Sequence, residues 1–249
     1  RQYDPSVQVS IKNGGGIRSS IGETVVLPGD VVATRLPNGE LVDSQGNVIK
    51  PEGGISQTDI QTTLAFNNSL ALLTLTSQEI VGLLEHGVSA LPDVSGRFPQ
   101  ISGVEFSFDV DRPAGSRIVD AEIVDGDGNT IAQLVENGTL VGDGTDTFRI
   151  VTLGFLAASR FDDDGNFTGG GDGYPFPNLN TDPSVGEVGD AAVIARVNFM
   201  DLEQEGVQTG DATFADDGTE QDALAEYLDD TYGTPETAFD MEDTGADAD

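Results

Sequence analysis

The sequence predicts an α+β fold, and three local patterns carry this prediction. Residues 76–79 (TSQE) form a capping box, and an apolar stripe at helical spacing follows it. Residues 104–110 alternate apolar and polar side chains, as a half-buried strand does. Residues 118–124 and 130–135 flank the turn sequence DGDGN, which indicates a β-hairpin. Helices are therefore mixed with strand hairpins along one chain.

The first part of the chain contains a strand, a turn-rich excursion and a short helix. Residues 7–11 alternate with period two, which predicts a strand that runs straight into a glycine-rich segment. Residues 35–55 include the turn sequences PNG and QGN, so we expect a short hairpin or excursion there. Residues 56–64 predict a short helix with Ile60 and Leu64 on one side.

The last part of the chain returns to one strand and then becomes helical. Residues 147–153 predict a strand, and residues 161–184 are so rich in Gly and Asp that we expect a loop. Helices are predicted around residues 191–202 and 219–228, the second opened by the sequence TEQD.

The expected organisation is one domain over residues 1–233 followed by a tail at residues 234–249. The tail is acidic and rich in small residues, which is typical of disorder. The chain begins with Arg1, shows no signal-peptide pattern and enters a strand-like run almost at once, so we expect a piece cut from a longer chain. No apolar stretch approaches the length of a transmembrane helix, so we expect no membrane span.

The charge balance is strongly acidic, with 44 Asp and Glu against 11 Lys and Arg and a formal net charge of −33. Such a chain repels a phosphate backbone at long range, which argues against nucleic acid and anionic membranes as partners. Acidic residues spread along the whole chain suit a saline setting, where counterions screen the self-repulsion. A phosphate ligand would need a locally placed Arg.

The residue types needed for most catalytic centres are scarce. The chain has no Cys and a single His, His86, near the end of the helix that follows the capping box. A pair of catalytic metals usually draws several His and carboxylate ligands, so we expect neither catalytic residues nor a metal cofactor in this chain. A structural role is the simplest interpretation of His86.

The glycine-rich segment at residues 13–18 (NGGGIR) is more informative. Glycines such as Gly15 let the backbone approach a ligand closely and expose amide N–H groups. Asn13 offers both a donor and an acceptor, and Arg18 offers a fork of donors that suits phosphate. A tight turn with a surface Arg is the alternative interpretation.

Two phenylalanines next to turn residues form a second constellation. Phe66 lies outside any periodic stripe, and Phe155 directly follows a predicted strand. Two aromatic faces can clamp a planar base, although ordinary core packing would use the same residues. Asp172, in the sequence GGDGY, is either a turn former or a carboxylate that binds hydroxyl groups, as on a ribose.

The acidic turns at residues 125–129 and 162–166 also raise the question of Ca²⁺ binding. Neither matches the full EF-hand loop, which places Gly at position six and Glu at position twelve. Both interpretations, acidic turn and calcium site, stay open at this point.

Taken together, these segments resemble the C-terminal domain of the 5'-nucleotidase family, which includes bacterial UDP-sugar hydrolases and animal ecto-5'-nucleotidases. The matching segments come in the family's order: residues 13–18 (NGGGIR), 64–68 (LAFNN), 75–80 (LTSQEI), 84–89 (LEHGVS), 96–103 (GRFPQISG), 154–157 (GFLA) and 170–174 (GGDGY). The resemblance implies a layered α/β/β/α fold of the α+β class. It also implies that the metal pair and the catalytic His–Asp pair belong to an N-terminal metallophosphoesterase domain, which is not in this chain.

The resemblance assigns roles to the candidate residues. Asn13 and Arg18 would bind substrate, with Arg18 at the phosphate. Phe66 and Phe155 would sandwich the base. Asp172 would bind the ribose hydroxyls. Asn68 and the backbone of Gly103 would lie against the edge of the base.

Three departures from the family pattern affect these roles. An insertion containing residues 160–167 separates Phe155 from Asp172, so Phe167 becomes a rival for the second stacking position. Ala65 stands where the family has Pro before the first Phe. The opening of the family's C-terminal domain, with another phosphate-binding Arg, is absent.

The leading hypothesis is therefore the substrate-binding domain of an extracellular or periplasmic nucleotide phosphohydrolase, inactive as a fragment. Its partners would be a nucleotide or nucleoside and the N-terminal domain. The alternative is a non-enzymatic, acidic extracellular module, stabilised by calcium, in which the motifs serve only as scaffold.

Overall fold

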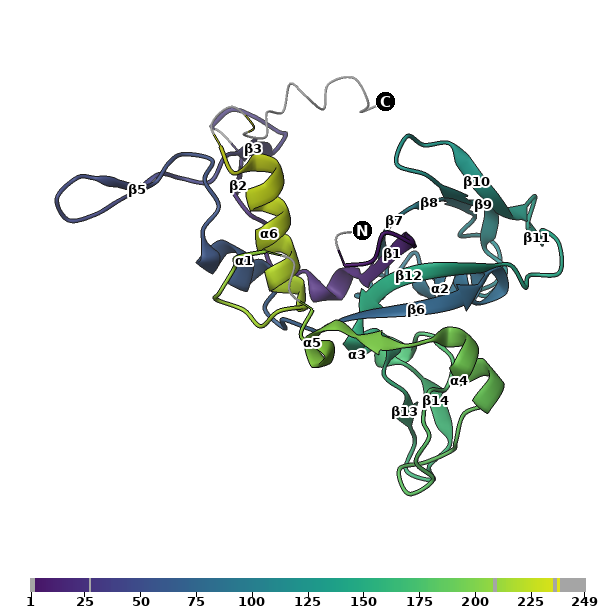
Figure 1. Ribbon diagram of the computed structural model, residues 1–249. Coiled ribbons are helices and arrows are strands. Elements are labelled where there is room, and N and C mark those ends of the chain that lie inside the picture. The colour runs from purple at the N-terminus through teal and green to yellow at the C-terminus, as the bar shows by residue number, and fades with distance from the viewer. Residues whose placement is uncertain (1–2, 27, 208–209, 235–236, 238–249) are drawn as a thin grey trace. The chain divides into compact units, whose positions relative to one another are not determined.

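The computed structural model describes residues 3–26, 28–207, 210–234 and 237 (Figure 1). Contacts divide the chain into two compact units, which are described separately. Unit 1 contains residues 1–17 and 68–207, and unit 2 contains residues 18–67 and 208–249. The expected single domain over residues 1–233 stays a prediction, and nearly all of the expected tail lies outside the described residues.

Unit 1 contains a mixed five-stranded sheet in the order β15-β6-β12-β1-β7. Its strands are β1 (Val7–Asn13), β6 (Leu70–Thr76), β7 (Pro99–Ser102), β12 (Thr147–Leu153) and β15 (Met200–Asp201). The two central strands β1 and β12 are parallel, and the other pairs are antiparallel. The predicted strands at the positions of β1 and β12 are confirmed.

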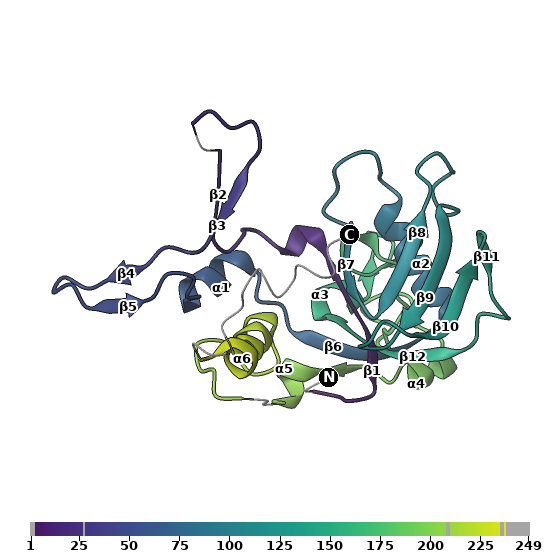
Figure 2. The same cartoon turned by 90° about the horizontal axis from the view of Figure 1, so that it is seen from above.

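A second, antiparallel sheet of unit 1 has the order β11-β10-β9-β8 (Figure 2). Its strands are β8 (Val104–Phe108), β9 (Ile118–Val124), β10 (Thr130–Glu136) and β11 (Thr139–Leu140). The alternating strand and the hairpin expected from the sequence are both confirmed. Gly103 joins the two sheets with a left-handed φ of 78°, and a Cβ there would collide with the carbonyl oxygen of Gln8. The bend therefore requires glycine.

Helix α2 (Ser77–Val88) contacts strands of both sheets and confirms the predicted capping box. The Thr76 side chain accepts from the backbone N–H of Glu79, and the Glu79 carboxylate accepts from that of Thr76. The helix buries Ile80, Leu83 and their neighbours in the same core as the inner faces of the sheets. The α+β class follows from this arrangement of two sheets and packed helices.

The segment expected to be a loop at residues 161–184 is partly regular, which corrects that prediction. Helix α3 (Gly154–Ala157) is followed by a hairpin of β13 (Arg160–Phe161) and β14 (Phe167–Gly169), and then by the 3₁₀ turn η2 (Gly171–Gly173). The insertion is therefore a hairpin with its own ladder.

The prediction of a single helix over residues 191–202 is wrong. The structure has α4 (Ala191–Val197) and α5 (Leu202–Glu205), with β15 between them. Asn198 adopts a left-handed conformation with a φ of 47°, which ends α4 and lets β15 pair with β6.

Unit 2 contains two hairpins and two helices. Their bounds are β2 (Glu23–Val25), β3 (Thr34–Leu36), β4 (Leu41–Val42), β5 (Val48–Lys50), α1 (Gln57–Thr63) and α6 (Glu220–Tyr232). Helices α1 and α6 contact each other, and both occur where the sequence predicted a helix. The excursion at residues 35–55 is confirmed as the β4–β5 hairpin.

The same five-residue turn, D-x-x-G-N, closes three hairpins, at residues 43–47, 125–129 and 162–166. In each, the Asp carboxylate accepts from the backbone N–H groups two and four residues later and from the Asn side chain. The Gly is left-handed in all three. These carboxylates therefore serve their own turns, which is the acidic-turn interpretation.

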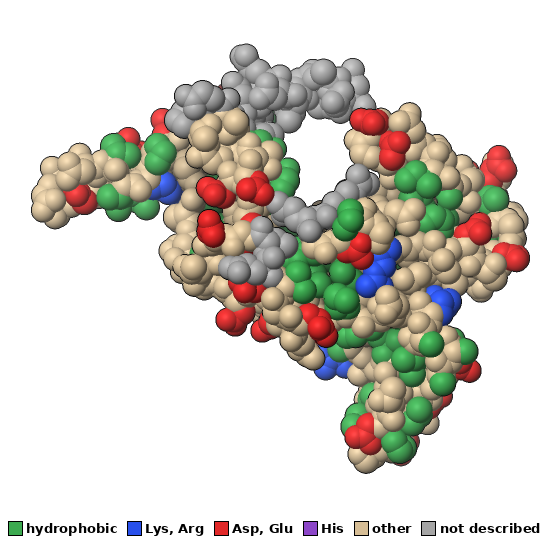
Figure 3. All heavy atoms as spheres, viewed as in Figure 1, with side chains coloured by type: hydrophobic (Ala, Val, Ile, Leu, Met, Phe, Trp, Pro, Cys, Tyr) green, Lys and Arg blue, Asp and Glu red, His purple; other side chains and the backbone are tan. Residues whose placement is uncertain are grey.

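Acidic side chains are spread over the face shown in Figure 3 rather than gathered in one patch. Apolar side chains such as Val48 and Ile49 are exposed on the β4–β5 hairpin. Among the described residues, no helix combines the length and the apolar character needed to cross a bilayer.

Candidate functional site

Asn13 ends β1 in the interior of unit 1 and is only 5% exposed. Its Nδ2 donates to Oδ2 of Asp172 at 2.7 Å, although the two residues are 159 positions apart in sequence. The structure therefore brings together two residues to which the resemblance assigns substrate contacts.

The other amide atom of Asn13, Oδ1, is buried and has no hydrogen-bond partner. Rotating the amide would place this oxygen against the Asp172 carboxylate, where two acceptors would repel each other, so the observed orientation is favoured. An unpaired buried acceptor costs about 1–3 kcal/mol. The oxygen therefore has an unused capacity to accept a hydrogen bond.

The three glycines after Asn13 form the 3₁₀ turn η1 (Gly14–Gly16). The backbone N–H of Gly14 donates to the carbonyl of Phe98, and that of Gly15 donates to the carbonyl of Gly96. A Cβ on Gly15 would lie 3.0 Å from the Cα of Gly96, which explains the glycine. These two amides are therefore engaged by the protein, which corrects the expectation that they would be exposed to a ligand.

Asp172 is exposed in η2 and has a left-handed backbone, with φ 55° and ψ 16°. The ring of Phe155 packs directly on the preceding residue, because a Cβ on Gly171 would lie 2.6 Å from its Cε1. The guanidinium carbon of Arg160 lies 5.4 Å from the centre of the same ring, a cation–π distance. Phe155, Asp172 and Asn13 therefore form one contiguous group in unit 1, which we call the Asn13 group.

Phe167, the other candidate for the second stacking position, has different neighbours from Phe155. Its ring packs on Phe161 across the β13–β14 hairpin, with ring centres 6.2 Å apart. Its backbone N–H donates to Glu187. The geometry therefore favours Phe155 over Phe167 as the ring beside Asp172, and the stacking role itself stays a prediction.

Arg18 and Phe66 lie together in unit 2. The Arg18 guanidinium carbon is 5.7 Å from the centre of the Phe66 ring, and the Arg18 backbone N–H donates to the carbonyl of Thr63 in α1. Phe66 is 62% exposed, which is unusual for a ring of this size and rules out core packing. The pair is accessible to a ligand, and its roles at base and phosphate stay predictions.

The two residues expected at the base edge are both in unit 1. Asn68 is half-buried and directly precedes the strand pairing of β6. The carbonyl of Gly103 accepts from the backbone N–H of Val124, so this atom already has a protein partner. The structural reason for Gly103 is the sheet-to-sheet bend, and its contact with a base stays a prediction.

Two residues near the Asn13 group were not predicted from the sequence to lie close to the candidate binding residues. Arg160 was noticed only as part of the insertion, yet it stacks on Phe155. His86 was expected to be structural, and its Nε2 lies 3.0 Å from the carbonyl oxygen of Asp172. Burial, the largest influence, lowers the pKa of the His86 imidazole below its usual value. The partner of His86 is a backbone atom. Every residue has such an atom, so the sequence gives no sign of this contact.

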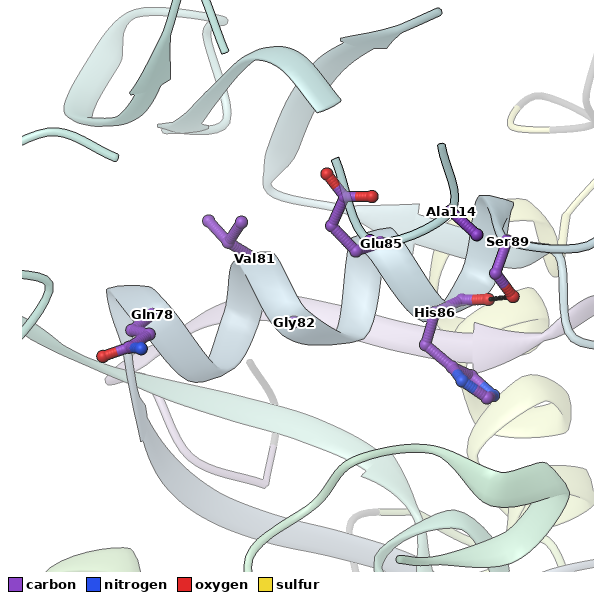
Figure 4. A pocket seen from close by; sticks show the side chains of 8 residues that line it. Gln78, Val81, Gly82, Glu85, His86, Ser89 and Ala114 are labelled. Atoms are coloured by element: carbon purple, nitrogen blue, oxygen red, sulfur yellow. Dashed lines mark hydrogen bonds between the residues drawn. The ribbon is translucent and has the colours of Figure 1, made fainter. Parts of the chain in front are cut away.

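No group of three or more His, Cys, Asp or Glu side chains within the described ranges could hold a metal ion. A concavity on the outer side of α2 is lined by Gln78, Val81, Gly82, Glu85, His86, Ser89, Ala114 and Gly115 (Figure 4). Its lining combines apolar residues with the polar side chains of Gln78, Glu85, His86 and Ser89.

Comparison with known proteins agrees with this fold. The family described as 5'-nucleotidase, C-terminal domain, matches residues 38–163. The fold also resembles the crystal structure of a 5'-nucleotidase precursor from Thermus thermophilus, with a TM-score of 0.52 and 23% identity over 94% of this chain and 30% of that one. The chain thus has the fold of a 5'-nucleotidase C-terminal domain, and it belongs to the 5'-nucleotidase family through that domain.

Two characterised relatives are similar in sequence. The trifunctional nucleotide phosphoesterase protein YfkN of Bacillus subtilis is 26% identical over 180 residues, which are 72% of this chain and 9% of that protein. The 5'-nucleotidase of Diplobatis ommata is 25% identical over 155 residues, 58% of this chain and 22% of that protein. The chain therefore spans less than a quarter of each of these relatives. The resemblance seen in the sequence is confirmed at the level of the family.

Proposed function

We propose that this domain recognises a nucleoside or nucleotide, with the nucleoside bound at the Asn13 group of unit 1. The observation that carries the proposal is the buried, unpaired Oδ1 of Asn13 beside the exposed Asp172 carboxylate. Family membership and the nucleotide phosphoesterase name of the Bacillus relative support the ligand class.

The chemistry of the group suits a ribose and a base. An ionised carboxylate accepts hydrogen bonds only, and the free amide oxygen of Asn13 also accepts, so both seek hydroxyl or amino donors. A ribose supplies two adjacent hydroxyl donors. Phe155 provides an aromatic plane next to Asp172, and stacking of a base on such a plane contributes about 1–3 kcal/mol.

The phosphate contact in this proposal belongs to Arg18 of unit 2. Its guanidinium can give a paired set of hydrogen bonds to phosphate, and its neighbour Phe66 offers an exposed ring on which a base can stack. In a chain with a net charge of −33, such a local Arg is what an anionic ligand needs.

For the whole protein we propose hydrolysis of nucleotide phosphate esters by a metallophosphoesterase domain outside this chain. The domain described here would then bind and orient the substrate. We also propose an extracellular or periplasmic location, because an acidic surface of this kind suits a saline medium.

Binding of adenosine to the chain, measured by calorimetry or ligand-detected NMR, tests the nucleoside site. We expect Phe155→Ala to weaken binding by about 1–3 kcal/mol. Phe167→Ala is the matched control, because it removes the same ring from the β13–β14 hairpin, and it should leave affinity unchanged. Equal affinity of wild type and Phe155→Ala, with the fold intact, would contradict the proposal.

The phosphate contact has its own test. We expect AMP to bind more tightly than adenosine, and Arg18→Ala should erase that preference while leaving adenosine binding largely intact. A preference for AMP that survives in Arg18→Ala would show that another group binds the phosphate.

A further inference from the structure

His86 contacts the backbone of the loop that carries Asp172, whereas Asn13 contacts the Asp172 side chain. A carbonyl oxygen only accepts hydrogen bonds, so the 3.0 Å approach of His86 Nε2 to the carbonyl oxygen of Asp172 requires the proton to be on Nε2. The carboxylate of the same residue meets Nδ2 of Asn13 at 2.7 Å. Asp172 is thus held at its backbone by one residue and at its side chain by another.

The loop needs this support because its backbone is locally unfavourable. Asp172 and Gly173 are both left-handed, with φ values of 55° and 74°, and a non-glycine residue reaches that region only at a cost. The His86 ring packs along the loop: its centre is 4.8 Å from that of the Tyr174 ring, and a Cβ on Gly173 would touch it at 3.5 Å. Tyr174 is fully buried, and its hydroxyl donates to the carbonyl of Arg97.

Helix α2, which carries His86, is anchored to the rest of unit 1 by hydrogen bonds near its end. Its last turn is fixed from β9, because the Arg117 guanidinium donates to the carbonyls of Val88 and Ser89, and the Glu85 carboxylate accepts from the backbone N–H groups of Arg117 and Ile118. Figure 4 shows His86 projecting from the opposite side of the helix to Val81 and Glu85. These hydrogen bonds therefore anchor the last turn of α2, which carries His86.

We infer that His86 is a positioning residue, which holds the Asp172 peptide so that its carboxylate meets Asn13 and can accept from the ligand hydroxyls. This inference rests on the proposed nucleoside site. Displacements of about 1 Å at a binding group are enough to lose much of its effect, so a single hydrogen bond to the loop backbone can decide whether the carboxylate is in place.

Two substitutions separate the hydrogen bond from the packing. His86→Gln keeps an N–H donor at the same number of bonds from the backbone, whereas His86→Phe keeps an aromatic ring on Tyr174 and removes the donor. Adenosine and 2',3'-dideoxyadenosine, which lacks the two adjacent 2'- and 3'-hydroxyls of the ribose, serve as ligands. We expect wild type and His86→Gln to prefer adenosine by about tenfold, and His86→Phe to lose the preference while its affinity for the dideoxynucleoside is unchanged.

A readout without ligand keeps this inference separate from the proposed function. The side-chain amide protons of Asn13 report its contact with Asp172 in NMR spectra, and they should shift toward solvent-exposed values in His86→Phe but not in His86→Gln. If wild type shows no preference for adenosine, the ribose assignment fails, while the amide shift still decides the role of His86.

The imidazole of the wild-type protein provides the last measurement, which needs no variant to fold. Long-range ¹H–¹⁵N spectra distinguish the two neutral tautomers, and we expect the proton on Nε2 at neutral pH. A proton on Nδ1, or a folded His86→Phe with an unshifted Asn13 amide, would overturn the inference.

Discussion

The carboxylate of Asp59 is expected to stabilise unit 2 in a pH-dependent way. It accepts from the backbone N–H and hydroxyl of Ser56 at 2.8 and 2.6 Å, from the Asn38 amide at 2.8 Å and from the Lys50 ammonium at 3.3 Å. Partial burial alone would raise the pKa of Asp59, but these hydrogen bonds outweigh it and lower the pKa from 3.8 to about 2. One carboxylate thus joins the start of α1 to the β4–β5 hairpin.

The size and sign of the effect follow from this pKa. A folded-state pKa that is lower by almost two units corresponds to about 2 kcal/mol of unfolding free energy, and this is an upper limit because the side chain is 25% exposed and solvent screens it. Because the folded pKa is depressed, the stabilisation is complete above the unfolded pKa of 3.8 and is lost as the pH falls toward 2.

Asp59→Asn keeps the shape of the side chain and removes its charge. At neutral pH we expect α1 amides in the variant to exchange faster than in wild type, with up to about 2 kcal/mol lost, and we expect the two proteins to converge near pH 2. Glu52→Gln removes an exposed charge from the same excursion and is the control for net charge. A difference between Asp59→Asn and wild type that is the same at neutral pH and at pH 2 would refute the reasoning.

Three further outcomes are expected. The melting temperature should rise from low to molar NaCl and equally in KCl, because salt screens the repulsion among net negative charges; no rise would contradict this. Gly103→Ala should destabilise by at least about 1–3 kcal/mol in urea, because the new methyl meets the carbonyl of Gln8, whereas Gly115→Ala, equally left-handed but in open space, should cost less. Tyr174→Phe should cost about 1 kcal/mol by leaving the part-buried carbonyl of Arg97 with one partner fewer, and unchanged urea unfolding would argue against that bond.

The elements that the sequence predicted correctly are those fixed by local signals. The capping box of α2, the alternation of β8 and the turn of the β9–β10 hairpin each lie within a few residues. Strand β6 was missed because it is buried on both faces between β12 and β15, so its apolar residues do not alternate. The break between α4 and α5 was missed because β15 depends on pairing with the distant β6.

At the candidate site, too, the sequence predicted residues with local signals but not their long-range contacts. Family resemblance pointed to Asn13 and Asp172 separately, and their hydrogen bond across 159 positions could not be read from either segment. The expectation that glycine amides face a ligand failed at Gly14 and Gly15, because the partner carbonyls come from another part of the fold. Backbone partners of this kind leave no mark in the residue types.

The turn shared by three hairpins has a consequence for how this domain can change during evolution. A D-x-x-G-N turn is closed by hydrogen bonds to its own side chains, so it can end strand pairs of different lengths. In the hairpin between Phe155 and Asp172, Arg160 and Gly169 pair directly across the ladder, so the chain leaves and returns at adjacent points. Outside its base, the hairpin is also held by Glu187, which accepts from the Phe167 backbone N–H and donates its own backbone N–H to the Gly165 carbonyl. Because the hairpin starts and ends at paired residues, we expect a change in its length to leave the ring of Phe155 and the carboxylate of Asp172 close together.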